Sequence, residues 1–427
     1  MREILSALDG ISRRAWIERT AKAALGVGML PLLSRTVAAA AAAKGRRLVY
    51  LYMAGGMTHL DTFDVKPDSK ETQGQTGSIA TAVPGVQLSE YLPSLANRMK
   101  DIAVIRSMNT QTADHEQGEY LMRTSYESIA TERHPSLGPW MQRLRGRQNK
   151  TLPDTVLIGS PARHPAAGFL DPTFSPLPIG DPVKGLENTT APSYLSEASF
   201  ERRMALINQF DRKFRDKYPV RNVKAYSDFY DEATSLLTSG ELKAFDLKQE
   251  KAEVRDRYGL DPFGQGCLLA RRLIENNVPC VEVTLGGWDM HNTMWDYNTL
   301  PTRARNMDRA VGALLADLAD SGLLTQTVVV LATEFGRSPA INYNAGRDHH
   351  PAVFSAMLAG AGIRAGQTYG SSDKRGHAVE KDGVSPADLN ATVAEALGLP
   401  RTEVVHSPTG RPFTVAGDGK PVKALLS

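Results

Sequence analysis

Thr327-Val328-Val329-Val330-Leu331-Ala332-Thr333-Glu334-Phe335-Gly336-Arg337 contains a short apolar run with a polar segment directly after it. The run is rich in β-branched residues and nearly continuous, as in strands that are covered on both faces. Such strands occur in parallel sheets flanked by helices, and ligands bind at their carboxyl ends. We therefore predict an α/β fold with functional side chains just after its strands.

Five further apolar runs have the same character. They are 47–53, 102–105, 155–159, 278–285 and 353–359. Helical patterns lie between the runs, and the clearest is an apolar stripe over residues 307–318. Another helix is predicted to begin at Ser385-Pro386-Ala387-Asp388, with a capping serine and a proline in its first turn, and to end at Gly398. Strands that alternate with helices predict a mostly parallel sheet flanked by helices.

The first 43 residues have the order of an export signal. Ser12-Arg13-Arg14-Ala15-Trp16-Ile17 resembles the twin-arginine pattern, and a short apolar stretch (23–33) and an alanine run (38–43) follow it. The apolar stretch is shorter than the roughly 20 residues that span a bilayer. We expect recognition by the twin-arginine export machinery, a periplasmic or secreted location and no stable membrane span. A buried N-terminal helix is the alternative.

Charge and cysteine content narrow the function classes. The whole chain has a formal net charge of +3, and residues 1–43 hold six basic and three acidic residues, which is also +3. The remainder is therefore near neutral and has no electrostatic signature of a nucleic-acid partner. The two cysteines, Cys267 and Cys280, lie in apolar segments, so buried thiols are favoured over a disulfide.

Residues 46–415 are predicted to form one large α/β domain. Within it, about 160–260 differ: 160–190 are rich in Pro and Gly and predict a long loop, and 193–260 predict a helical insertion. The insertion has helical spacing over Phe200–Phe214 and Phe229–Phe245. Residues 416–427 have weak signals and are predicted to be a C-terminal surface tail.

Three more polar segments flank the apolar runs. They are Gly55-Gly56-Met57-Thr58-His59-Leu60-Asp61, Gly286-Gly287-Trp288-Asp289-Met290-His291 and Gly346-Arg347-Asp348-His349-His350-Pro351. Because the carboxyl ends of parallel strands share one edge, the side chains after them are expected to converge. Imidazole and carboxylate groups together bind zinc and similar divalent metals. The candidate metal ligands are His59, Asp61, Asp289, His291, Glu334 and His349.

Catalytic candidates surround these ligands. Arg337 and Arg347 are suited to an anionic substrate, because a guanidinium makes paired hydrogen bonds to oxyanions. Arg337 could instead neutralise Glu334, which could itself cap a helix. The hydroxyls of Thr58 and Thr112 are possible nucleophiles, and metal-activated water is the alternative. His115 follows the second predicted strand and could reach the same edge.

With these residues in view, the chain resembles the domain-of-unknown-function 1501 family, an exported group related to the alkaline phosphatase and sulfatase superfamily. The segments that carry the resemblance are 55–64, 286–291, 333–339 and 346–349. It implies an alkaline-phosphatase-like core with Asp and His ligands around one or two divalent metals. Zinc is the first choice; calcium, magnesium and manganese are alternatives.

The resemblance also suggests roles for individual residues. Asp289 and His291 look like the superfamily's Asp/His pair, Glu334 like the acid of a second pair, and His349 like the last histidine ligand. Phe335 stands where the superfamily usually has the histidine of that second pair.

Two functions follow from these patterns. The first is an exported metal-dependent hydrolase of phosphate or sulfate esters, whose anionic ester substrate includes sulfated or phosphorylated glycans. The second is a non-catalytic periplasmic binding protein that retains the sulfatase-like fold. An exported redox protein is disfavoured, because the sequence has no cysteine cluster, haem-attachment motif or dinucleotide fingerprint.

Overall fold

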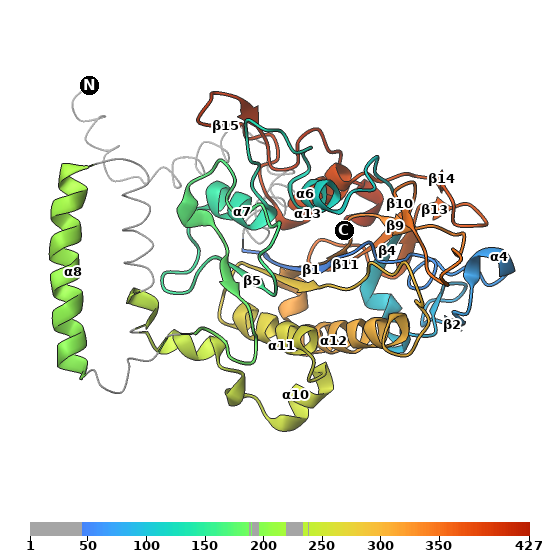
Figure 1. Ribbon diagram of the computed structural model, residues 1–427, viewed down its shortest axis with the longest axis horizontal. Coiled ribbons are helices and arrows are strands. Elements are labelled where there is room, and N and C mark those ends of the chain that lie inside the picture. The colour runs from blue at the N-terminus through green and yellow to red at the C-terminus, as the bar shows by residue number, and fades with distance from the viewer. Residues whose placement is uncertain (1–44, 188, 190–195, 219–233, 238) are drawn as a thin grey trace, which may run out of the picture. The chain divides into compact units, whose positions relative to one another are not determined.

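The central sheet has the strand order β12-β4-β11-β8-β1-β7-β5-β6 (Figure 1). Its strands are β1 (Arg47–Met53), β4 (Ile102–Met108), β5 (Thr155–Ile158), β6 (Leu177–Ile179), β7 (Cys280–Leu285), β8 (Thr327–Ala332), β11 (Phe354–Gly360) and β12 (Gln367–Tyr369). All neighbours pair in parallel except β11, which is antiparallel to both β4 and β8. The predicted mostly parallel sheet is therefore confirmed.

This computed structural model describes residues 45–187, 189, 196–218, 234–237 and 239–427. The predicted export signal, residues 1–43, lies outside the described residues. Residues from Arg46 onward belong to one unit of the chain. In the described part of the chain, no helix is both long and apolar enough to cross a membrane.

The strands form where they do because both of their faces are apolar. On β1, Val49 and Leu51 belong to the hydrophobic core on one face of the sheet, while Leu48 and Tyr50 belong to the core on the other. Strand β8 alternates in the same way, and all six of its residues are buried. The continuous apolar runs therefore reflect two cores, one on each face.

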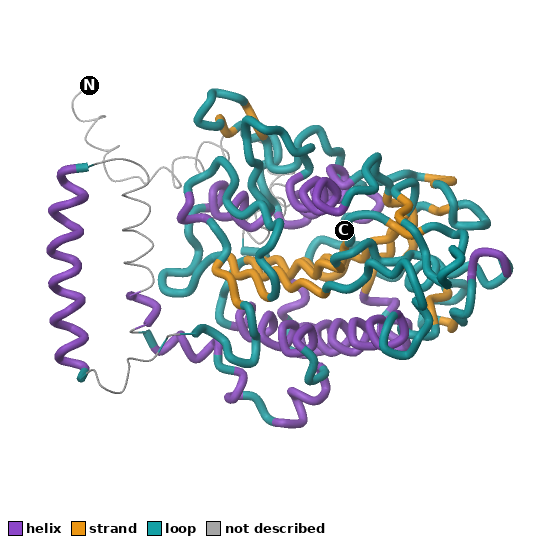
Figure 2. Tube along the Cα trace, in the orientation of Figure 1, coloured by secondary structure: helices purple, strands orange, loops and turns teal. Residues whose placement is uncertain are grey.

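Helices cover both faces (Figure 2). One core is completed by α5 (Pro93–Asn97), α11 (Pro262–Glu275) and α12 (Leu300–Asp320). The other is completed by α6 (His115–Thr124), α7 (Leu137–Arg145) and α13 (Pro386–Leu397). The stripe predicted over 307–318 lies in α12, and α13 begins with a capping box between Ser385 and Asp388.

The described residues also form four small two-stranded sheets and several short helices. They are β2 (Ser78–Ala80) with β3 (Gln87–Ser89), β9 (Gly336–Arg337) with β10 (His349–His350), β13 (Ser371–Ser372) with β14 (Val379–Lys381), and β15 (Val405–His406) with β16 (Pro412–Phe413). The short helices include α4 (Lys70–Gln73), η1 (Met99–Asp101), η2 (Pro172–Phe174), η4 (Leu247–Gln249), α10 (Ala252–Tyr258), η5 (Leu323–Gln326) and η6 (Lys423–Leu425).

The predicted loop and helical insertion are partly regular. The 160–190 segment contributes β6, which extends the sheet beside β5. The predicted helix Phe200–Phe214 lies within α8 (Glu197–Lys217). Part of Phe229–Phe245 lies outside the described residues, and its last six residues, Gly240–Phe245, form a 3-10 helix. A glycine there disfavours an α-helix, because it loses more backbone freedom on folding than other residues do.

The C-terminal segment differs from the predicted surface tail. Leu425 is fully buried in one of the two cores, and the backbone of Leu426 pairs with Ile363. The amide of Ser427 also donates to the carbonyl of Gly362. A few apolar residues after a polar stretch are enough to anchor this end, and the sequence pattern did not show it.

The two cysteine thiols are free and buried. Burial raises the pKa of both Cys267 and Cys280 above the ordinary value of a thiol, because the charged thiolate is disfavoured away from water. The favoured interpretation, two buried thiols, is confirmed.

Candidate metal centre

Sheet direction explains why residues from four segments meet. Strands β1, β4, β7 and β8 point the same way, so the loops after them lie at one edge of the sheet. Strand β11 points the opposite way, so the residues before it lie at that same edge. His349 precedes β11 and pairs in register with Arg337 of β9. The edge thus collects His115, Asp289, His291 and His349.

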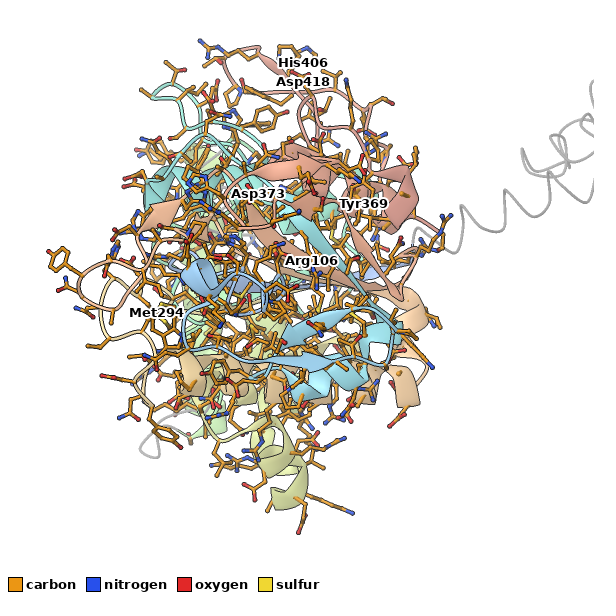
Figure 3. All side chains as sticks on the ribbon, turned by 90° about the vertical axis from the view of Figure 1, so that its right-hand side faces the viewer. Arg106, Met294, Tyr369, Asp373, His406 and Asp418 are labelled. Atoms are coloured by element: carbon orange, nitrogen blue, oxygen red, sulfur yellow. The ribbon has the colours of Figure 1, made fainter. Side chains whose placement is uncertain are left out.

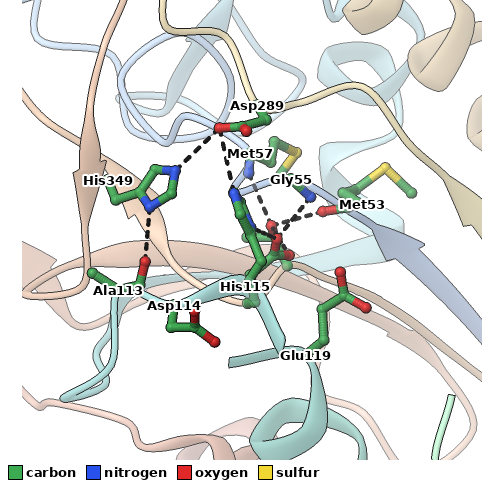
Figure 4. A network of polar contacts seen from close by, with 12 residues as sticks. Met53, Gly55, Met57, Ala113, Asp114, His115, Glu119, Asp289 and His349 are labelled. Atoms are coloured by element: carbon green, nitrogen blue, oxygen red, sulfur yellow. Dashed lines mark hydrogen bonds and ion pairs between the residues drawn. The ribbon is translucent and has the colours of Figure 1, made fainter. Parts of the chain in front are cut away.

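His115, the first residue of α6, faces the centre with one nitrogen only. Its Nδ1 donates to Oε1 of Glu334 at 2.7 Å. Its Nε2 is buried without a hydrogen-bond partner and lies 3.4 Å from Oδ1 of Asp289 (Figure 4). Because Nδ1 carries the donated proton, Nε2 of the neutral ring presents a lone pair.

His349 and His291 are held in the same manner. Nδ1 of His349 donates to the carbonyl of Ala113 at 2.7 Å, and Nδ1 of His291 donates to Oδ1 of Asp348 at 2.8 Å. Their Nε2 atoms lie 3.1 and 2.9 Å from Oδ1 of Asp289, and 3.0 Å from each other. Each of the three imidazoles is therefore tethered from outside, with Nε2 turned inward.

This arrangement fits a divalent cation. Three neutral Nε2 lone pairs and a carboxylate oxygen repel one another. Of these four groups, Arg337 donates only to Asp289 and to Nε2 of His291, so a cation among them would offset the remaining repulsion. The ligand atoms of His115, Asp289 and His349 all lie within 4.8 Å of one another. Histidines that bind a metal donate their other ring N–H to a carboxylate or carbonyl, as these three do. The residues present thus match a metal site in both donor set and support.

Charges around the cluster favour an ionised carboxylate. Burial raises the pKa of Asp289, but the hydrogen bond from Arg337 and the positive charge of its guanidinium outweigh burial, and the pKa lies well below its usual range. The hydrogen bond to Glu334 raises the pKa of His115 above its ordinary value, although burial opposes this. Protons and a metal cation therefore compete for Nε2 of His115.

Glu334, a predicted ligand, lies behind the centre instead. Its Oε1 accepts from the amide of Gly55 and from His115, both at 2.7 Å. Its Oε2 accepts from Tyr52 at 3.0 Å and from Thr333 at 3.2 Å. The side chain is fully buried, so its oxygens are saturated by protein donors. Glu334 orients His115 rather than facing the cluster.

His59, Asp61 and Thr58 are not brought to the centre. Asp61 is fully buried and accepts from Thr58 and Thr76, each at 2.6 Å, and from Arg347 at 2.8 Å. His59 is also fully buried, and its Nε2 donates to the carbonyl of Gly376. Burial lowers the pKa of His59 to about 4, so the ring is neutral. These residues anchor the loop after β1.

The two arginines predicted to bind substrate are engaged by the protein. Arg337 is 1% exposed; it donates to the carbonyls of Gly55, Gly56 and Arg347, to Nε2 of His291 and to Asp289. Arg347 is fully buried; it donates to Asp61 and to the carbonyls of Thr72, Ser338 and Pro339. Binding an anion would require breaking these bonds, so the structure assigns both arginines to clamping the loops of the site.

Thr112 is the one of the two predicted nucleophiles that stays accessible. Its hydroxyl donates to Gln117 at 3.2 Å and accepts from the amide of Asp114, just before α6. Thr58 is 2% exposed and donates to Asp61. Sequence reasoning missed Asp348 as the partner of His291 and placed His115 among catalytic groups. The Asp-His sequence before a predicted strand was the available signal for Asp348.

Comparison with known proteins gives distant structural similarity. No curated protein matches the chain. Similar solved structures include Ps i-CgsB (12% identity, TM-score 0.43, 88% of this chain and 74% of that chain). Others are the lipoteichoic acid synthase LtaP from Listeria monocytogenes (9%, 0.41, 85% and 74%) and a protein in the alkaline phosphatase superfamily from Vibrio parahaemolyticus (9%, 0.41, 90% and 70%).

The match at the level of the family is extensive. A family model described as "Protein of unknown function (DUF1501)" covers residues 45–426, which is nearly all of the chain after the predicted export signal. The resemblance seen in the sequence is thereby confirmed. The chain belongs to the DUF1501 family.

Proposed function

We propose that this protein is an exported metal-dependent hydrolase of phosphate or sulfate esters. The observation that carries the proposal is the convergence of three outward-tethered imidazoles on one oxygen of Asp289. His115, Asp289, His291 and His349 would hold the metal. A polar cluster that served stability alone would not need three imidazole lone pairs directed at one carboxylate oxygen.

The donor set favours zinc over the other candidates. Three imidazoles and one carboxylate suit zinc, which binds nitrogen and oxygen ligands together. Calcium and magnesium prefer shells made of oxygen, so they fit this set poorly. Manganese is intermediate, because it accepts imidazole but prefers carboxylate and water.

The bound metal would supply a Lewis acid that polarises the ester oxygen and eases deprotonation of the attacking hydroxyl or water. The chain's own residues do the rest. Glu334, Asp348 and the carbonyl of Ala113 fix the imidazoles, while Arg337 holds Asp289 ionised. The accessible hydroxyl of Thr112, three residues before His115, is the proposed protein nucleophile; water is the alternative.

The test is hydrolysis of chromogenic phosphate and sulfate esters by zinc-loaded protein without residues 1–43. We expect turnover that is lost in His291→Ala and kept in His406→Ala. His406 is an exposed histidine on β15, away from the centre, and serves as the matched control (Figure 3). Zinc-loaded protein that hydrolyses no ester in the panel would contradict the proposal.

One observation favours the second candidate, a non-catalytic periplasmic binding protein. Neither Arg337 nor Arg347 has a guanidinium free for substrate. This candidate predicts tight zinc binding and measurable ligand binding without turnover in the same assay. The first candidate predicts turnover.

A further inference from the structure

A groove of about 1390 Å³ runs past the amino end of α6. Its walls include residues 109–114 and Gln117 on one side and residues 127–133 on the other, and Arg163 also lines it. Ala113 and Asp114 line this groove, and Ala113 is the residue whose carbonyl holds His349. The groove therefore borders the metal centre.

Arg163 differs from the two clamped arginines. Its side chain is 52% exposed, and its nearest acid is Glu119, with Nη1 at 3.5 Å from Oε1. That is longer than the roughly 2.7–2.9 Å of a charge-assisted hydrogen bond. Among the described residues, no hydrogen bond of its guanidinium meets the usual geometry. Its donors are therefore available to a ligand.

Arg163 is also placed within reach of the centre. Glu119 follows His115 by four residues on α6, so the two lie on the same face of the helix, one turn apart. Figure 4 shows Glu119 beside His115 in the polar network. Arg163 lines the groove and contacts Glu119, which is one helical turn from His115, so Glu119 links its guanidinium to the helix that carries His115.

The backbone holds Arg163 in a costly conformation. Its φ is 61°, in the left-handed region that residues with a side chain rarely adopt. The next residue, His164, is fixed by Glu282 at 3.1 Å, and its carbonyl accepts from Arg133 at 2.7 Å. Strained residues persist where the surroundings fix them, and they cluster at functional sites.

We propose that Arg163 binds the oxyanion of the substrate, the sulfate or phosphate group of the ester that reacts at the centre. The inference rests on the proposed function where it concerns the ester that reacts, whereas anion binding by Arg163 does not depend on that function. Arg133 lines the same groove and adds a second guanidinium near His164. Four acids, Asp114, Glu116, Glu127 and Glu132, also line the groove, so it suits a single oxyanion held by the guanidinium groups and not a polyanionic chain.

The test measures binding of inorganic phosphate and inorganic sulfate by calorimetry, with and without zinc, using protein without residues 1–43. Arg163→Ala is expected to weaken binding of both anions about tenfold or more, since hydrogen bonds to charged groups are the strong ones. Arg163→Lys keeps the charge but not the paired hydrogen-bond geometry, so its anion affinity should lie between those of wild type and Arg163→Ala. Arg143→Ala is the matched control, because Arg143 is exposed and lies 3.9 Å from its acid, Glu403.

A second variant separates binding from folding. Arg163→Gly removes the guanidinium and suits the positive φ, so it should lose anion binding while its thermal midpoint stays or rises. Unchanged anion affinity in Arg163→Ala and Arg163→Gly would overturn the proposal. So would loss of stability without loss of affinity, which would make Arg163 only a partner of Glu119. Anion binding that depends on Arg163, without ester turnover, would support the binding role of Arg163 and contradict only the proposed hydrolysis.

Discussion

Glu334 determines which nitrogen of His115 faces the metal centre. Its carboxylate is buried and accepts four hydrogen bonds, one of them from Nδ1 of His115. The pattern of a carboxylate behind a histidine raises the basicity of the nitrogen on the far side. Glu334, the acid that follows β8, therefore orients a candidate ligand without itself facing the cluster.

Glu334→Gln should weaken zinc binding by about 10–100-fold, the usual effect of removing the partner of a metal-binding histidine. The amide keeps the shape but loses the charge that favours Nδ1–H. Chelator competition would measure the zinc affinity. Glu116→Gln is the control. It changes an exposed acid on α6, the helix that begins with His115, and should change the zinc affinity little. Equal affinities in the two variants would contradict the role of Glu334.

The residue scale also shows why some of the side chains that converge at this edge could be predicted and others could not. His291 and His349 follow from short segments in which the sequence places His beside a carboxylate. His59 and Asp61 have the same appearance, but Arg347, 286 positions further on, binds Asp61 and buries it. Which histidine turns toward the edge depends on such distant partners, and one sequence does not contain that information.

At the scale of elements, α6 docks on the sheet through charged side chains. His115, Glu119 and Arg123 recur at spacings of four and lie on one face. Arg123 donates to Glu282 of β7 at 2.8 Å and stacks over the ring of Tyr52 of β1. The first of these three residues reaches the metal centre. The charged docking of α6 therefore sets the position of a ligand.

The buried carboxylate of Glu282 makes the stability of the fold depend on pH. Burial raises its pKa, but Arg123 and His164 outweigh burial and lower the pKa to about 2, from an ordinary value of 4.5. A carboxylate with a lowered pKa contributes its full stabilisation when the pH is above its ordinary pKa. That contribution is lost as the pH falls from about 4.5 toward 2. The loss is on the order of 3 kcal/mol.

Glu282→Gln should remove this acid dependence and lower stability at neutral pH by about 3 kcal/mol, because the buried Arg123 loses its carboxylate at 2.8 Å and keeps only Glu119 at 3.2 Å. Urea unfolding at pH 7 and at about pH 3, inside the window between the two pKa values, measures both effects. Glu253→Gln, on an exposed position of α10, is the control. A stability difference between wild type and Glu282→Gln that is the same at both pH values would contradict the account.

Sheet direction is the element-level feature that the sequence left open. The apolar runs gave the positions of the strands, and the helices between them indicated a parallel sheet. The reversal of β11 has no signature in its own residues, yet it alone explains why His349 before a strand meets Asp289 after one. The long-range pairing of β11 with β4 and β8 decides it.

At the scale of the whole molecule, two cores on either side of one sheet hold the site at a single edge. At one end of the sheet, β12 pairs with β4, and Tyr369 lies opposite Ile105 (Figure 3). The fold class and the family could be predicted from the sequence, because apolar periodicity and ordered motifs are local. The packing of residues 416–427 could not, because it depends on a few apolar contacts.

Export remains a prediction for the chain as a whole. Replacing both Arg13 and Arg14 by Lys should keep the protein in the cytoplasm, because the twin-arginine pattern is read as a pair. Cell fractionation of a bacterial host with immunoblotting measures this. Arg19→Lys, in the same segment but outside the pair, is expected to be exported normally. Export of the double variant at the normal level would contradict the twin-arginine route.

The central claim is that three histidines and Asp289 hold a metal at this edge. Zinc X-ray absorption spectroscopy on zinc-loaded protein without residues 1–43 tests it most directly. We predict a shell of nitrogen and oxygen at about 2.0–2.1 Å with the outer scattering of imidazole rings, and weaker imidazole scattering in His349→Ala. Protein that binds no zinc, or a spectrum without imidazole scattering, would contradict the account.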